Sequence, residues 1–133
     1  MYLLDTNVVS ELRRPNPHPL VVDWIRGIPD EHLYLSAVTI GEIQAGIELT
    51  REQDARKAKG LETWLNQVLA TYNILAVDAA AFREWAKLIH RRSDTLLQDA
   101  LIAAVAIVHR LIVVTRNVRD FEPFGVEIIN PFE

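Results

Sequence analysis

The stretch LLQDALIAAVAIVHRLIVVTRNVRDF at residues 96–121 decides the fold of this chain. The segment from Leu97 to Val108 is apolar nearly all round, which predicts a helix buried on every side. The run Leu111-Ile112-Val113-Val114 follows it without polar alternation, which predicts a strand covered on both faces. Such strands occur in parallel sheets, because the crossover helices lie on both faces. The stretch therefore predicts one buried helix and one central strand of a parallel sheet.

The same alternation of strand and helix extends through the rest of the sequence. Further strands are predicted at residues 2–4, 32–35, 72–77 and 126–129. Two short helices are predicted at residues 8–12 and 20–28. One long helix is predicted to begin at the N-cap Ser36, to continue through the charged stretch 51–59 and to end at Leu69. A further helix is predicted from Asp78, its N-cap, to Arg92. About four to five strands alternating with helices predict an α/β fold, in which a central parallel sheet has helices on both faces.

Length and composition indicate an ordinary globular protein with one domain at residues 1–133. Half of the 133 residues are hydrophobic, and the net charge of −4 argues against nucleic-acid binding through bulk positive charge. The absence of cysteine excludes disulfides, thiolate zinc sites and cysteine catalysis. No apolar run is long enough for a membrane span, and the first residues lack signal-peptide features. We therefore expect a cytoplasmic protein that does not contact a membrane.

Four carboxylates stand near the predicted carboxyl ends of strands, where ligands bind in such folds. Asp5 follows the first strand, Glu42 lies on the helix that Ser36 caps, Asp99 is the only acidic residue of the apolar helix, and Asp120 follows the central strand. Each also has a structural interpretation. Asp5 is a candidate N-cap and Glu42 a candidate solvated side chain, while Asp99 fits the positive end of a helix and Asp120 a turn.

Asp99 is the most informative of the four, because a lone carboxylate on a buried helix is costly unless it meets a cation or hydrogen-bond donors. Carboxylates gathered at one sheet edge without a lysine repel one another, and a divalent cation relieves that repulsion. Ligands that are all oxygen favour Mg²⁺ or Mn²⁺. The pattern therefore predicts hydrolysis of phosphodiester bonds by a metal-activated water.

Four ordered blocks of this sequence resemble the signature blocks of PIN domains, and the branch they resemble most is that of the VapC-type toxins of bacterial type II toxin–antitoxin systems. The blocks are residues 3–11, 36–42, 99–104 and 115–121. The resemblance implies a PIN-like three-layer fold over residues 1–133. It also implies a catalytic quartet of acidic residues, namely Asp5, Glu42, Asp99 and Asp120. Of these, Asp5 and Asp99 are implied as the main metal ligands.

The resemblance also covers polar residues around the quartet. Thr6, Asn7, Thr115 and Asn117 match supporting polar positions, and it stays open whether Asp120 or Asn117 lies closer to the metal. Four arginines near the acidic blocks are candidates for contact with RNA phosphates at the rim, with solvated surface as the alternative: Arg91, Arg92, Arg116 and Arg119.

The family resemblance implies RNA cleavage with Mg²⁺, for which Mn²⁺ substitutes, and inhibition by a cognate antitoxin in a heterotetramer or larger complex. It also implies a homodimer, for which the apolar stripe of Leu61, Trp64, Leu65 and Val68 is a candidate contact. A function of another class stays open, namely a dimeric subunit of a DNA-binding regulatory complex whose nuclease activity is secondary. The sequence shows no helix-turn-helix and no basic helix, so operator DNA would be contacted only through the antitoxin.

Overall fold

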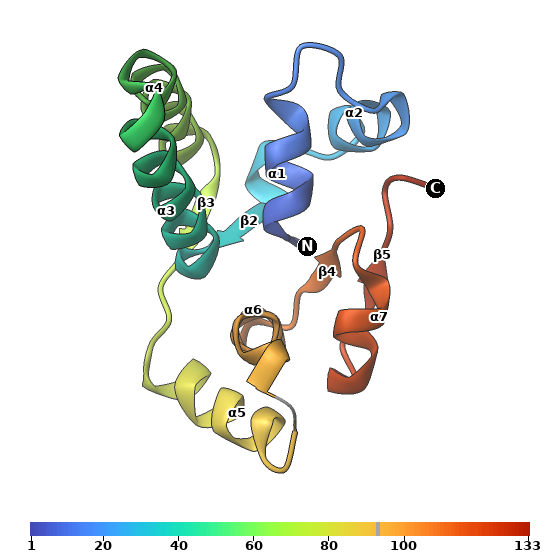
Figure 1. Ribbon diagram of the computed structural model, residues 1–133. Helices are drawn as coiled ribbons and strands as arrows, with labels where there is room; N and C mark the ends of the chain where they lie inside the picture. The colour runs from blue at the N-terminus through green and yellow to red at the C-terminus, as the bar shows by residue number, and fades with distance from the viewer. Residues whose placement is uncertain (93) are drawn as a thin grey trace.

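In the computed structural model, which describes residues 1–92 and 94–133, a parallel sheet lies between two groups of helices (Figure 1). The strand order is β3-β2-β1-β4-β5, and every neighbouring pair is parallel. The arrangement confirms the predicted α/β fold. The strands are β1 (Tyr2–Leu4), β2 (Leu33–Ser36), β3 (Asn73–Leu75), β4 (Ile112–Val114) and β5 (Ile128–Ile129).

The neighbouring interior strands β1 and β4 each contribute side chains to both hydrophobic cores, because successive side chains of a strand point to opposite faces. Leu3 and Val113 are buried in one core, and their neighbours Leu4 and Val114 are buried in the other. This explains why both strands read as continuous apolar runs. The first core is covered by α5 (Ala79–Ile89), α6 (Leu97–His109) and α7 (Val118–Phe121), and the second by α1 (Thr6–Leu12), α2 (Pro19–Arg26), α3 (Ala37–Gln53) and α4 (Ala55–Thr71).

Several predicted elements are shorter than the sequence pattern suggested. β3 and β5 lie at the two edges of the sheet and pair with one neighbour only, so their regular hydrogen bonding ends early. β2 begins one residue later than predicted, because 3-10 helix η1 (Asp30–His32) precedes it. α5 ends at Ile89 instead of Arg92. Four short elements were not predicted, namely η1, α7 and the 3-10 helices η2 (Asp94–Leu96) and η3 (Glu122–Phe124).

The long helix predicted through residues 51–59 is wrong at one position, Asp54. Its backbone is not helical, with φ of −151° and ψ of 89°. The Asp54 N–H donates to the carbonyl of Thr50 at 2.7 Å and closes α3, while its carboxylate accepts from the N–H of Lys57 at 3.0 Å and caps α4. Aspartate is a strong N-cap, and here it divides one predicted helix into two.

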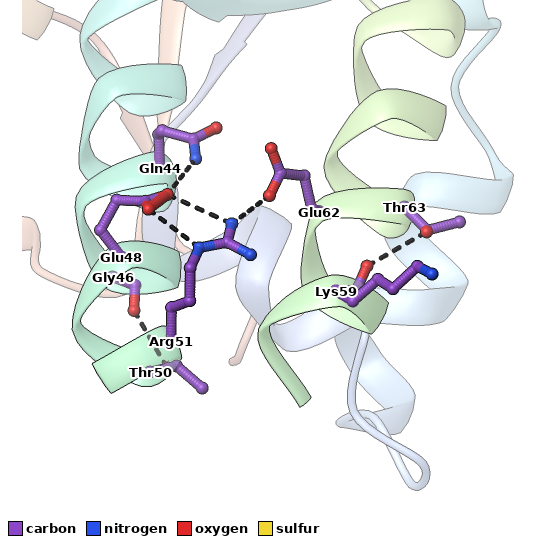
Figure 2. A network of polar contacts seen from close by, with 8 residues as sticks. All are labelled: Gln44, Gly46, Glu48, Thr50, Arg51, Lys59, Glu62 and Thr63. Carbon is purple, nitrogen blue, oxygen red and sulfur yellow. Dashed lines mark hydrogen bonds and ion pairs between the residues drawn. The ribbon is translucent and has the colours of Figure 1, made fainter. Parts of the chain in front are cut away.

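An arginine joins α4 to α3 near the break (Figure 2). The Arg51 Nε donates to Glu48 at 3.0 Å on the same helix, and its Nη2 pairs with Glu62 of α4. Gln44 donates to the same Glu48 at 2.8 Å. Exposed ion pairs of this kind each contribute only about 0–1 kcal/mol. The hairpin of α3 and α4 is therefore held mainly by its buried face.

The apolar stripe of α4 belongs to that buried face. Leu65 and Val68 are 2% and 5% exposed, and Leu61 and Trp64 pack against the same core. The break at Asp54 lets α4 fold back, so Leu65 and Val68 are buried within the chain and are not available for the predicted dimer contact, whereas Leu61 and Trp64 are only half-buried. For Leu61 and Trp64 the dimer contact stays a prediction. None of the helices in residues 1–92 and 94–133 combines the length and apolar character of a membrane span.

Candidate active site

Asp5 stands at the carboxyl end of β1 and is 4% exposed. Its Oδ1 accepts from the N–H of Thr6 at 2.8 Å and so caps α1, as one of its two interpretations predicted. Its Oδ2 accepts from the Thr115 hydroxyl at 2.7 Å and from the Asn7 amide at 3.1 Å. Burial raises the pKa of Asp5, and these hydrogen bonds oppose the rise.

The end of β4 supplies the second half of this polar arrangement. Because β1 and β4 are neighbours, Thr115 meets Asp5 although the two are far apart in sequence. The Thr115 hydroxyl also accepts from the N–H of Asn117 at 2.9 Å and from the Asn7 amide at 3.3 Å. The Asn7 Oδ1 in turn accepts from the N–H of Arg116 at 3.2 Å. Thr115 and Asn7 therefore fix one carboxylate oxygen of Asp5 and the loop after β4 together.

Glu42 is half-buried on α3, in contrast to its interpretation as a solvated side chain. Burial and the charges of Asp5 and Asp99 raise its pKa, and a hydrogen bond from Thr6 partly offsets the rise. The Thr6 hydroxyl also bonds that of Thr39, at an oxygen–oxygen distance of 3.1 Å. Thr39 is fully buried and was not among the predicted site residues. Its signal was present, because residues three apart on a helix share a face and Thr39 precedes Glu42 by that spacing.

Asp99 lies half-buried in the first turn of α6. Burial, followed by the charges of Asp5 and Asp120, raises its pKa to about 6. Asp120 lies in the first turn of the short helix α7, in contrast to its interpretation as a turn residue. Its charge also raises the pKa of Asp5, whereas Asn117 donates its backbone N–H to Thr115, which in turn donates to Asp5. The four carboxylates therefore form one electrostatic cluster, which we call the acid cluster: Asp5, Glu42, Asp99 and Asp120.

The acid cluster suits a hard divalent cation. Within the described part of the chain, no Lys or Arg forms an ion pair with any of its four members. In the same residues, no three carboxylate or imidazole groups are arranged to hold one ion together. Mg²⁺ usually takes one or two protein carboxylates and completes its shell with water and phosphate oxygens. An all-oxygen donor set of mutually repelling carboxylates fits that mode of binding.

The four arginines predicted at the rim divide into two pairs. Arg116 and Arg119 line an open groove of ≈ 420 Å³ beside Asp120. Arg92 instead donates to the carbonyl of Pro123 at 3.1 Å, and Arg91 is exposed with a φ of 60°. A second hollow, of ≈ 260 Å³, is bordered by Thr6 and Glu42. The acid cluster thus borders two open hollows, of which only the first holds arginines predicted to contact RNA.

Comparison with known proteins gives concordant matches. Residues 2–124 match the family described as PIN domain. The chain is 37% identical to VapC ribonuclease Y4jK of Sinorhizobium fredii, over 100% of this chain and 99% of that protein. It is 35% identical to toxin FitB of Neisseria gonorrhoeae, over 99% of each. The solved structure of FitAB bound to an IR36 DNA fragment contains a chain with a TM-score of 0.88 and 33% identity, over 100% of this chain and 96% of that one.

Proposed function

Because this chain belongs to the PIN-domain family, and within it to the VapC-type toxins of toxin–antitoxin systems, we propose that it is an Mg²⁺-dependent endoribonuclease. The acid cluster carries the proposal. Burial and mutual repulsion raise the pKa of Asp5, Glu42 and Asp99. A bound divalent cation would relieve the repulsion between these carboxylates. The proposal extends to a single PIN domain over residues 1–133, acting in the cytoplasm, with Mn²⁺ as a substitute metal.

The residues of the cluster have distinct roles in this proposal. Asp5 and Asp99 hold the metal, which when bound supplies a water of lowered pKa and stabilises the leaving oxyanion. Thr115, Asn7 and the N–H of Thr6 hold Asp5 in one orientation. Glu42, whose pKa is raised, is suited to accept a proton beside the scissile phosphate. Asp120 adds negative charge next to Asp5 and Asp99.

The direct test is cleavage of a labelled RNA with single-stranded loops, which RNA-binding proteins generally prefer. We expect cleavage in Mg²⁺ or Mn²⁺ and none in EDTA, with activity restored when metal is added back. Mg²⁺ is also expected to raise the melting temperature, since a ligand that binds only the folded state stabilises it. Asp99→Asn protein purified in parallel controls for contaminating nucleases. Full cleavage in EDTA would refute the metal mechanism.

A second candidate function is membership in a DNA-binding regulatory complex with the antitoxin. The similarity to a chain of FitAB, solved bound to DNA, favours it. We propose that the chain forms a homodimer and reaches operator DNA only through the antitoxin. Sedimentation of the chain alone should give about twice 15.1 kDa, and a mobility-shift assay should show operator binding only when the adjacent-gene product is added. Operator binding by the chain alone, or a monomeric mass at tens of micromolar, would contradict this.

A further inference from the structure

Arg116 lines the ≈ 420 Å³ groove, and its side chain is supported by an aromatic ring. Its guanidinium carbon lies 4.7 Å from the ring centroid of Phe132, a distance at which the ring face attracts a cation. Its N–H donates to Asn7, so its backbone is tied to the same side chain that donates to Asp5. Arg116 is therefore positioned from two directions, through its backbone by the active site and through its side chain by Phe132.

Phe132 is itself held in place. Its N–H donates to the Asn130 side chain at 3.0 Å, and its half-buried ring packs against the second core. The ring of His18 meets it at 5.5 Å between centroids and an interplanar angle of 71°. The N–H of His18 donates at 3.0 Å to Glu11, a carboxylate that is only 7% exposed. An aromatic ring supported on this many sides forms a firm platform for a flexible arginine.

The charge of Arg116 is available for a ligand. Within the described residues Arg116 makes no ion pair with a carboxylate. Asp5 accepts its hydrogen bonds from Thr6, Asn7 and Thr115, whereas the guanidinium of Arg116 stacks on Phe132 instead. A planar guanidinium matches the oxygens of a phosphate. In this place it would meet a phosphate that flanks the scissile one.

We propose that Phe132 is a positioning residue, which presents Arg116 to a phosphate of the RNA strand flanking the scissile bond. The proposal rests on the proposed ribonuclease function and adds where the strand is gripped and by what means. The contact is made equally in the ground state and the transition state, because it lies away from the reacting phosphate. Loss of it should therefore raise KM and leave kcat nearly unchanged.

Four variants test this: Phe132→Leu, Phe132→Tyr, Arg116→Ala, and the double variant of Phe132→Leu with Arg116→Ala. We expect Phe132→Leu to raise KM for RNA about three- to tenfold, the range of a cation–π contact, with kcat within about twofold. Phe132→Tyr keeps the ring face and should restore KM. In the Arg116→Ala background, Phe132→Leu should add nothing, because a positioning residue acts only through its partner. Phe82→Leu is the matched control, as Phe82 is an exposed aromatic residue on α5.

A purely structural role gives a different pattern. Partial unfolding lowers the apparent kcat through the amount of active enzyme, whereas KM does not depend on enzyme concentration. The proposal would be overturned if Phe132→Leu and Arg116→Ala had additive effects on KM. It would also be overturned if Phe132→Leu lowered kcat by as large a factor as it raised KM.

Binding of a labelled single-stranded RNA in EDTA separates this proposal from the ribonuclease function. Arg116→Ala should weaken binding and reduce the slope of log affinity against log salt by about 0.7, the value for one phosphate contact on a single strand. If RNA is bound in this way but never cleaved, the ribonuclease function fails and the positioning role stands. If Phe132→Leu and Arg116→Ala both bind RNA as wild type does, the positioning role is wrong. The same conclusion holds if these two variants weaken binding of the antitoxin and leave RNA binding unchanged.

Discussion

Replacing Asp99 with asparagine is expected to lower RNA cleavage by at least about 10²-fold, since several kcal/mol of charge stabilisation would depend on the metal that Asp99 is proposed to hold. Asparagine keeps the size of the side chain in the first turn of α6, so the helix should be retained. What is lost is the negative charge that Asp5 and Asp120 repel. Single-turnover cleavage of a labelled RNA in Mg²⁺ measures the effect.

The same substitution is expected to preserve or raise the stability of the metal-free protein. The pKa of Asp99 is raised from 3.8 to about 6, so in that interval the folded protein holds a proton that the unfolded chain has released. Stability from this group is therefore present at low pH and lost as pH rises through about 4 to 6. At pH 7 the charged, half-buried group costs ~1 kcal/mol after allowance for screening by solvent. Thermal melts in EDTA at pH 5 and pH 7 test this, with the smaller pH dependence expected for Asp99→Asn.

Asp23→Asn is a matched control, because Asp23 is an exposed carboxylate on α2. It should change neither cleavage nor the pH dependence of stability. Cleavage by Asp99→Asn within about twofold of wild type would show that Asp99 serves only its own helix terminus.

The second large effect is expected from Thr115→Val, which removes a buried hydroxyl with little change in shape. That hydroxyl donates to Asp5 at 2.7 Å and accepts from Asn117 at 2.9 Å. Removing partners of a metal ligand typically costs 10–100-fold in activity, and we expect a loss of about that size. Leaving these polar groups without a partner should also lower the free energy of unfolding by ~1–3 kcal/mol. Cleavage kinetics and urea denaturation measure the two effects.

The pH profile of cleavage gives an independent check on Thr115. Its hydrogen bond lowers the pKa of Asp5 against the effect of burial, so its loss should raise that pKa and move the acid limb of the profile to higher pH. Thr115→Ser restores a hydroxyl and should recover most of the activity. Thr63→Val, at an exposed hydroxyl that bonds only its own helix at Lys59, is the control. An unchanged profile in Thr115→Val would mean that Asp5 does not need this partner.

Much of the fold could be predicted because its signals are local. Ser36 accepts from the N–H of Val38 and caps α3, and Asp78 accepts from that of Ala81 and caps α5, as the sequence predicted. The apolar runs of β1 and β4 indicated burial on both faces, which the two cores confirm. The break at Asp54 was missed because the charge run around it resembles the exposed face of a continuous helix.

The amino-acid sequence by itself determined the parallel α/β fold and the four carboxylates of the acid cluster, because strand ends, caps and a lone charge on an apolar helix are read from neighbouring residues. Only the tertiary structure decided how these groups act on one another. The contact of Thr115 with Asp5 depends on the pairing of β1 with β4. The stack of Arg116 on Phe132 likewise joins the loop after β4 to residues beyond β5. The physical reason is that pKa shifts and shared hydrogen bonds depend on distances between groups that are remote in sequence.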